Sequence, residues 1–418
     1  MKDTGTSLTS NRQTHLDGLR GLAAMLVVIA HGIVAFDYAL FSGQSSDSIS
    51  SWDVFVSGAP LLVPLAGNLA VCIFFALSGY VLSQSFATTG LGIVALVLKR
   101  YTRLSIPILT ACLVSYSLLA GNLMANVQLA SITRSSWLAR QMQQAPSITE
   151  AVREGLYSSL IHLKPVPTPY DSVLWTMCIE FWGSIVLILV FGLTGIGASN
   201  PKKRETRRIV TLIALGILGC TSYLGLFALG ALLYISRLHL RVNSKLAAAL
   251  LILGVFLGTV PFSSVPWQIM RSLVAPTMIT VPGVPFPLIR ITFVHSIGAV
   301  FILISANSFA PFRRMLSSPG FRFLGRISFP LYLVHSPILM SVVSKAAVAL
   351  FRVGLGYAAS TAIALGLLVT VSVAVATGLL YICELPSIKF SGLVANATDG
   401  LVRKVFTRAL GFHPQRFN

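Results

Sequence analysis

Ten apolar stretches divide this chain, and they constrain its fold more than any other feature of the sequence. Of the 418 residues, 55% are hydrophobic and only 10% are charged, whereas a soluble domain carries about 25% charged residues. A helix needs about 20 apolar residues to cross the hydrocarbon core of a bilayer. The sequence therefore predicts an all-α integral membrane bundle of about ten transmembrane helices. The expected helices cover residues 16–38, 67–88, 103–121, 172–196, 208–221, 223–237, 246–262, 288–308, 323–344 and 357–384.

The basic residues indicate how this bundle lies in the membrane. The formal net charge is +19, and most of the 31 Lys and Arg residues fall in alternate segments between the apolar stretches. Such an excess is typical of cytoplasmic loops, so we expect both termini in the cytoplasm and a multi-pass protein of the cell (inner) membrane. Because the charges are dispersed rather than gathered in one domain, the lipid bilayer is an expected partner and nucleic acid is not.

Three segments are expected along the chain: a cytoplasmic N-terminal segment (1–15), a transmembrane domain (16–384) and a basic cytoplasmic tail (385–418). Two long loops are predicted outside, at 122–171 and 263–287, and the first is long enough to cap a cavity. The five cysteines all lie in expected helices without paired spacing. They predict apolar packing rather than a disulfide framework or a metal site.

The first expected helix carries two ionisable residues, Arg20 and His31. They are eleven residues apart, so they share one helix face about 16 Å apart along the axis. Ionisable groups at membrane depth are costly and usually face the bundle interior or a water-filled cavity. An imidazole changes charge near neutral pH, which suits a general base that takes a proton from a hydroxyl. The alternative is that His31 only forms a hydrogen bond between helices.

Two other polar residues are expected at similar depth, Glu180 on the helix at 172–196 and His335 on the helix at 323–344. Glu180 or another polar neighbour could orient His31, and a cavity shared by these groups is geometrically possible. Tyr332 and His335, three residues apart, could instead form a polar contact between helices. His295 is expected to be a packing residue.

A basic cluster precedes the third expected helix, and within it Arg100 and Arg103 share one helix face. Paired guanidinium groups bind phosphate oxygens well, because each can donate two parallel hydrogen bonds. The alternative is that both charges only fix the orientation of the helix in the membrane. The cluster at 201–204 is expected to have that role alone.

Several sequence blocks together resemble the acyltransferase-3 family of multi-span membrane acyltransferases. They occur in the family's order and span about 320 of the 418 residues. The blocks are LDGLRGLAA (16–24) followed by His31, FFALSGYVL (74–82), RYTR (100–103), LWTMCIEF (174–181) and GRISFPLYLVHSP (325–337).

The resemblance implies a ten-helix enzyme that esterifies a hydroxyl, commonly on a sugar, with an acyl group from cytoplasmic acyl-CoA. It implies that Arg20 and His31 match the family's essential first-helix residues, and that Arg100 and Arg103 match an arginine pair that holds the CoA phosphates. We therefore predict three groups of site residues: catalytic His31, Arg20 and Glu180; acyl-CoA-binding Arg100 and Arg103; and substrate-binding His335, Tyr332 and Trp175.

The predicted activity is O-acyl transfer, with acetyl as the expected group, to a carbohydrate, a glycolipid or another hydroxyl acceptor. Acyl-CoA would be a substrate, and no permanently bound cofactor is expected. One alternative is a transporter of a small amphipathic molecule in which His31 relays protons. A second is a non-catalytic scaffold in which Arg20 and His31 are structural. Dependence on acyl-CoA separates the enzyme from both.

Overall fold

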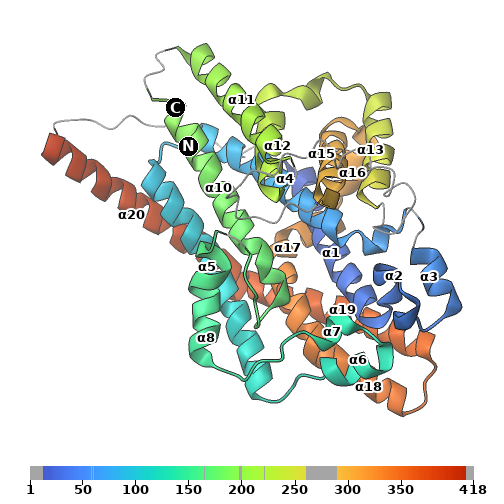
Figure 1. Cartoon of the computed structure of the whole chain (residues 1–418). Coiled ribbons are helices and arrows are strands. Elements are labelled where there is room, and N and C mark those ends of the chain that lie inside the picture. Colours follow the sequence, from blue (N-terminus) through green and yellow to red (C-terminus); the bar gives the residue numbers. More distant parts are fainter. Residues whose placement is uncertain are drawn as a thin grey trace, which may run out of the picture.

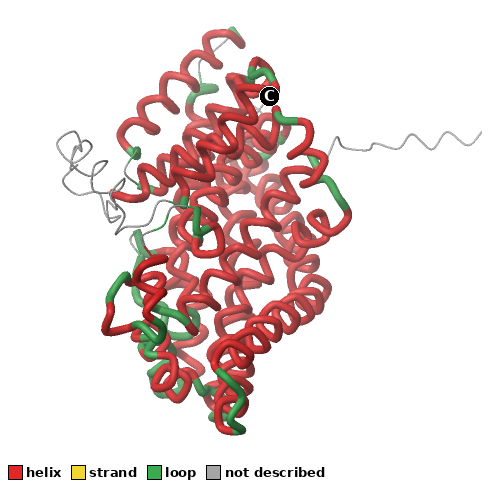
Figure 2. Tube along the Cα trace, turned by 90° about the vertical axis from the view of Figure 1, so that its right-hand side faces the viewer, coloured by secondary structure: helices red, strands yellow, loops and turns green. Residues whose placement is uncertain are grey.

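The protein is a bundle of helices that pack side by side (Figure 1). The computed structural model describes residues 13–57, 59, 61–163, 165–196, 200–220, 222–259 and 290–410. Figure 2 shows the bundle from a second side, with helices and loops but no strand in the part of the chain that is described. The predicted all-α class is confirmed.

Among the described residues, six helices are long and apolar enough to cross a membrane, and a bent pair could form a seventh span. The bent pair, Phe293–Ser308 and Ala310–Leu316, turns by 92° at its break. Each of the ten expected segments lies largely on a helix, but ten crossings and cytoplasmic termini stay predictions. The six are α1 (Thr14–Phe36), α4 (Gly67–Thr88), α5 (Ile93–Ala120), Ser172–Leu193 with α10 (Trp175–Leu193), Pro319–Arg352 with α17 (Pro319–Ile338) and α18 (Ser344–Arg352), and Tyr357–Val405 with α19 (Tyr357–Leu379).

Shorter helices complete the fold. Some pack among the long helices, and others connect them. They are α2 (Ala39–Ser42), α3 (Ser51–Ser57), α6 (Asn126–Thr133), α7 (Ser136–Ala139), α8 (Ile148–Arg153), α9 (Ser159–Ile161), α11 (Pro201–Leu218), α12 (Tyr223–Ser236), α13 (Ser244–Gly258), α15 (Arg290–Ser308) and α16 (Ala310–Leu316).

Two helices differ from the expected boundaries. The third begins at Ile93 rather than at 103, so Arg100 lies inside α5 and Arg103 lies in its interior rather than at its first position. The last does not end at 384, because α19 continues through a π-helical turn (Leu380–Glu384) into α20 (Leu385–Leu410). α20 packs along α5 and projects from the bundle at the left of Figure 1. The expected tail at 385–418 therefore begins in the middle of a continuous helix.

The two ends of the bundle differ in character (Figure 1). The short helices α2, α3, α6, α7 and α8 gather at the lower end, which we call the loop end. At the upper end lie α11 and α16, which carry Lys202, Lys203, Arg313 and Arg314, and we call it the basic end. The excess of positive charge predicts that the basic end faces the cytoplasm.

Helices α1 and α17 approach each other unusually closely, and glycines make this possible. A Cβ atom on Gly21 would lie 2.4 Å from the backbone nitrogen of Gly325, and a Cβ atom on Gly325 would lie 2.1 Å from the carbonyl oxygen of Asp17. Small residues allow helix backbones in membranes to pack at such short range. These contacts lie in the first half of each helix, and His31 and His335 meet ten residues further along both.

The expected outer loop at 122–171 folds into α6 to α9 and packs against the loop end of the bundle. Ser135 donates a hydrogen bond to the carbonyl oxygen of Val34 at the end of α1 (2.8 Å). Leu129 and Leu138 are fully buried in this contact layer. The second expected outer loop, 263–287, lies outside the described residues.

A buried carboxyl group, Glu154, ties this segment together. It is only 4% exposed and accepts hydrogen bonds from the backbone N–H groups of Tyr170 (3.2 Å) and Asp171 (3.3 Å). Burial raises the pKa of Glu154 from 4.5 to about 7, because the charged form loses its hydration.

We expect Glu154 to make the fold less stable as pH rises. A raised pKa means that the folded state binds the proton more tightly than the unfolded chain does. The contribution of Glu154 to the free energy of unfolding is therefore complete below pH 4.5 and is lost as the pH rises through 7. Glu154→Gln should therefore lose less thermal stability than the wild type between pH 5 and pH 8 in detergent. Burial also raises the pKa values of Asp37 and Asp171, so some pH dependence stays in the variant. Identical pH dependence in both proteins would contradict this assignment.

Candidate active site

A cavity of about 540 Å³, which we call the arginine cavity, lies between α1, α4, α5, α10, α17 and the α19–α20 junction. Five arginines and three carboxylates line it, which leaves a net positive charge suited to an anionic ligand. Much of the remaining lining is apolar and includes Phe74, Leu82 and Phe329. The charged residues are Arg20, Arg100, Arg103, Arg322, Arg326, Asp17, Glu180 and Glu384.

Arg100 and Glu180 form a tight ion pair at the side of this cavity, and both side chains are 13% exposed. Arg100 also donates through Nε to Ser184 Oγ (2.8 Å), and Glu180 accepts from Ser78 Oγ (2.9 Å). Arg100 is therefore held in one orientation with much of its charge already compensated. Glu180 faces the arginine cavity. Of the two alternatives that the sequence left open, the contact to His31 is therefore made by another polar neighbour.

Arg20 and Arg103 are held more loosely. The Arg103 side chain is 41% exposed, and its Nη2 lies 3.8 Å from Glu384 Oε1. Arg20 Nη1 lies 3.9 Å from Asp17 Oδ1. Both distances are long for an ion pair, so these contacts hold the two guanidinium groups only weakly. Glu384 itself is only 8% exposed, whereas the exposed side of Arg103 is open to a ligand.

His31 forms a hydrogen bond with His335, on the neighbouring helix α17. His31 Nδ1 lies 2.8 Å from His335 Nε2, and His335 Nδ1 lies 3.2 Å from the carbonyl oxygen of Leu331. A carbonyl oxygen only accepts, so His335 carries its proton on Nδ1, and its Nε2 accepts the proton of His31 Nδ1. In the neutral pair, His31 Nε2 is therefore left unprotonated.

The ring of His31 is held from a second side by the segment at the loop end. Trp137 of α7 stacks on it, with ring centroids 5.2 Å apart and an interplanar angle of 5°. His335 is fully buried. These contacts fix the plane of the His31 imidazole, so its Nε2 has a defined direction.

A second cavity, of about 210 Å³, lies on the loop-end side of the arginine cavity, and we call it the histidine cavity. His31 and Trp175 line it, whereas Arg20 and Glu180 line the arginine cavity. Val71 and Tyr332 line both cavities and thus form a wall between them.

Tyr332 is fixed in this wall. Its hydroxyl donates to the carbonyl oxygen of Val173 (3.0 Å) and lies 2.9 Å from Thr176 Oγ1. Of the three residues predicted to bind substrate, Tyr332 and Trp175 line a cavity, and His335 lies behind His31. The placement of His335 favours an orienting role over direct contact with a substrate.

The comparison with known proteins fits this arrangement. The acyltransferase-domain model of the acyltransferase-3 family matches residues 14–379. The chain belongs to the acyltransferase-3 family. It is therefore a transferase enzyme, and its apolar helices indicate a multi-pass membrane protein.

Three fungal proteins are similar to this acyltransferase. O-acetyltransferase PaAT-1 of Phomopsis amygdali is 24% identical over 374 residues, which cover 78% of this chain and 71% of the relative. Acyltransferase R4 of a Phoma species is 24% identical, and acyltransferase clz18 of Cochliobolus lunatus is 23% identical. Each of these two alignments covers 78% of this chain and 82% of the relative. No solved structure is significantly similar.

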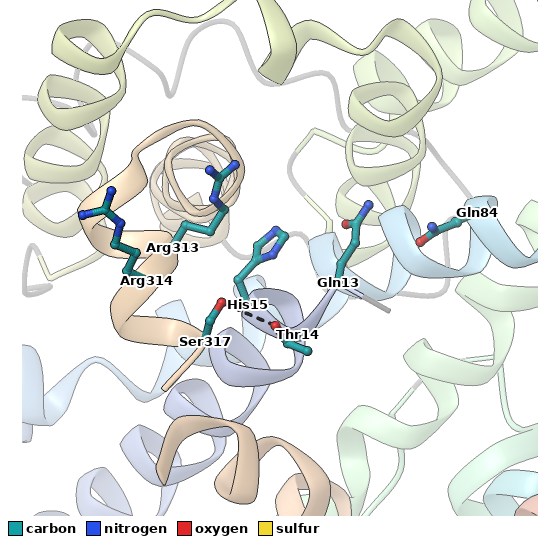
Figure 3. A pocket seen from close by; sticks show the side chains of 7 residues that line it. All are labelled: Gln13, Thr14, His15, Gln84, Arg313, Arg314 and Ser317. Carbon is teal, nitrogen blue, oxygen red and sulfur yellow. Dashed lines mark hydrogen bonds between the residues drawn. The ribbon is translucent and has the colours of Figure 1, made fainter. Parts of the chain in front are cut away.

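The acyltransferase has a third hollow, of about 440 Å³, at the basic end (Figure 3). It lies where the start of α1 meets α16, and Thr14 there donates a hydrogen bond to Ser317 Oγ (3.4 Å). Arg313 and Arg314 are exposed on its rim and do not line the arginine cavity. Substitution of either arginine can therefore serve as a control for substitutions of the arginines that line the candidate site.

Arg322, Arg326 and Glu384 were not predicted as site residues, yet they line the arginine cavity. The two arginines are four residues apart and so share one face of α17, a spacing that was visible in the sequence. Glu384 had no such signal, because it reaches the cavity only through the π-helical turn that joins α19 to α20.

Proposed function

We propose that this enzyme transfers an acyl group, with acetyl as the expected group, from acyl-CoA to a hydroxyl. In this proposal the donor enters the arginine cavity from the basic end, and the acceptor occupies the histidine cavity. The observation that carries the proposal is the pair of cavities on either side of one wall, with arginines lining one and His31, whose Nδ1 is bound to His335, lining the other.

The chemistry of CoA suits the arginine cavity. Its phosphates carry several negative charges, which cannot enter the hydrocarbon core of a membrane. Guanidinium groups bind such oxygens through charge-assisted hydrogen bonds. The apolar part of the same cavity suits the long acyl-bearing arm, which would point toward Tyr332 and the wall.

His31 would act as the general base. Nε2 takes the proton of the acceptor hydroxyl while that oxygen attacks the thioester carbonyl; the C–S bond then breaks and the proton passes to the CoA thiolate. His335 Nε2 accepts a hydrogen bond from the Nδ1–H group of His31 throughout, which keeps His31 Nε2 basic and stabilises the imidazolium that forms on His31. Brief transfer of the acyl group to Nε2 would use the same nitrogen.

The direct test is transfer of a labelled acetyl group from acetyl-CoA by the purified full-length protein in lipid. The proposal predicts an alkali-labile labelled product with an added hydroxyl acceptor, and none without acyl-CoA. Movement of a small amphipathic molecule across vesicles without acyl-CoA, and with no labelled product, would favour the transporter instead. The carbohydrate or glycolipid acceptor and the inner-membrane location stay predictions from the family resemblance.

Removal of Arg103 should weaken donor binding. One charge-assisted hydrogen bond contributes about 1.5–3 kcal/mol, so we expect Arg103→Ala to raise the apparent KM for acyl-CoA roughly tenfold or more, with little change in the KM for the acceptor. Arg314→Ala, which removes an exposed arginine outside the cavity, is the matched control and should leave both constants unchanged. Equal donor KM values in wild type and Arg103→Ala would remove Arg103 from the donor site.

Arg100→Ala is a less selective test of donor binding. It would leave Glu180 partly buried without its cation, and loss of one partner of a buried ion pair is strongly destabilising, by about 3–5 kcal/mol in well-buried cases. Arg100→Ala should therefore lower thermal stability in addition to raising the donor KM. Arg103→Ala should lower it less, because it breaks a longer pair (3.8 Å) with Glu384 rather than a tight one.

A further inference from the structure

A chain of three polar side chains reaches the histidine cavity from helices other than α1 and α17. Tyr223 of α12 donates a hydrogen bond to Asn68 Oδ1 (2.5 Å), and Asn68 Nδ2 of α4 lies 2.7 Å from His295 Nδ1 of α15. His295 is 5% exposed and Tyr223 is 6% exposed. Asn68 and His295 line the histidine cavity together with His31.

The hydrogen-bond directions in this chain follow from its chemistry. With the Tyr223 hydroxyl donating to the amide oxygen, the amide nitrogen of Asn68 donates to His295 Nδ1, so neutral His295 carries its proton on Nε2. A carboxamide has two N–H groups and two lone pairs, and these bonds use one of each. Asn68 therefore keeps one donor and one acceptor site for a further partner.

The rest of the described lining of the histidine cavity is mainly apolar and includes Val34, Leu62 and Leu65. Trp175 adds an aromatic ring with one indole N–H donor. The hydroxyls of Ser57 and Thr259, which also line it, donate to carbonyl oxygens of their own helices, at 2.7 Å and 2.8 Å.

Among the described lining residues, the groups that can accept a hydrogen bond from an alcohol are thus concentrated at His31 and the Asn68–His295 pair, and Trp175 adds a single N–H donor. A sugar carries hydroxyls on every side, and each hydroxyl buried without a partner costs about 1–3 kcal/mol. An apolar molecule with few oxygens avoids that cost, and the transfer of its apolar surface out of water favours binding. The lining therefore fits a different acceptor class from the carbohydrate that the family resemblance implies.

We propose that the acceptor is an alcohol with an apolar body and a second oxygen group, with its reacting hydroxyl at His31 and its second oxygen at the Asn68–His295 pair. This inference rests on the proposed function. A volume of about 210 Å³ is smaller than the 300–1,000 Å³ of typical small-molecule sites. The cavity would thus hold the reacting end of the acceptor.

The experiment compares three acceptors at saturating acetyl-CoA: a cyclic hydrocarbon diol, the matched mono-alcohol without the second oxygen, and an alkyl glucoside. For wild type, we expect kcat/KM for the diol to exceed that for each of the other two at least tenfold. In Asn68→Ala, the preference for the diol over the mono-alcohol should fall at least tenfold. His295→Phe, which keeps the bulk of the ring, is the second variant if Asn68→Ala does not fold.

Ser57→Ala is the matched control, because Ser57 lines the same cavity but its hydroxyl is bound to its own backbone; it should keep the wild-type preference. Preference for the glucoside, or an equal loss of all three acceptors in Asn68→Ala, would overturn the inference while leaving acyl transfer intact.

A binding measurement separates this inference from the proposed function. Without acyl-CoA, the diol should raise the thermal stability of wild type more than the mono-alcohol does, and this difference should vanish in Asn68→Ala. If that difference is seen but no acceptor is acylated, the acyl-transfer proposal fails and the binding site stands. If the diol and the mono-alcohol stabilise the wild type equally and no acceptor is acylated, the inference is overturned.

Discussion

Replacement of His31 by alanine should abolish acyl transfer while the protein still folds. A positioned general base contributes about 10²–10⁴-fold to a rate. His31 lines the histidine cavity, and the hydrogen bonds from His31 to His335 and from His335 to Leu331 leave His31 Nε2 without a proton. We expect kcat to fall about 10³-fold or more. The measurement is single-turnover transfer from labelled acetyl-CoA at matched amounts of protein.

The folded fraction provides the control for this variant. His31 is only partly buried, so His31→Ala should elute as a single species and melt within a few degrees of wild type. Wild-type turnover in that folded fraction would end the assignment of His31 as base. Loss of the folded fraction itself would support the structural role that the sequence left open for this residue.

Replacement of His335 should lower kcat without changing the donor site. His335→Ala removes the acceptor that keeps the His31 proton on Nδ1, so the proton can move to Nε2 and block the base. We expect kcat to fall about 10²-fold, in line with the usual effect of losing proton-transfer assistance, with the KM for acyl-CoA unchanged.

Partial rescue distinguishes this positioning role from simple packing. His335→Gln retains a side-chain oxygen that can accept from His31 Nδ1, so it should recover a large part of the activity that His335→Ala loses. If His335→Gln and His335→Ala are equally slow, or if both keep wild-type kcat and only melt earlier, His335 does not orient His31.

Sequence reasoning identified the helices and the residues of α1 well, for physical reasons. Membrane helices must be apolar over their whole length, so their positions are visible without any tertiary contact. The placement of Arg20 and His31 on one face of α1 follows from helix periodicity alone. The structure adds that this face passes along two cavities, with Arg20 at one and His31 at the other.

The partners of these residues could not be predicted in the same way. His31 and His335 are 304 residues apart, and their contact depends on the close glycine packing of α1 against α17. Glu180 has the right depth to meet His31, but its carboxylate pairs with Arg100 instead. Depth along a helix follows from the sequence, whereas the direction that a side chain faces depends on how the helices pack.

His295 is a second residue whose contacts could not be predicted from the sequence. A single histidine in an apolar helix is a weaker signal for a site than the Arg20 and His31 pair, and His295 was expected to be a packing residue. Its importance comes from Asn68, 227 residues away, and from the cavity that both residues share with His31. Neither neighbour is visible from the sequence around His295.

The central claim is that donor and acceptor approach the wall at Tyr332 from opposite ends of the bundle. It is tested most directly in sealed vesicles of known protein orientation, with labelled acetyl-CoA, which does not cross the membrane, added to one side at a time. We predict labelled, alkali-labile product only when acetyl-CoA is on the side of the basic end, and none from the same vesicles with His31→Ala. Equal labelling from either side, or labelling only from the loop end, would contradict the account.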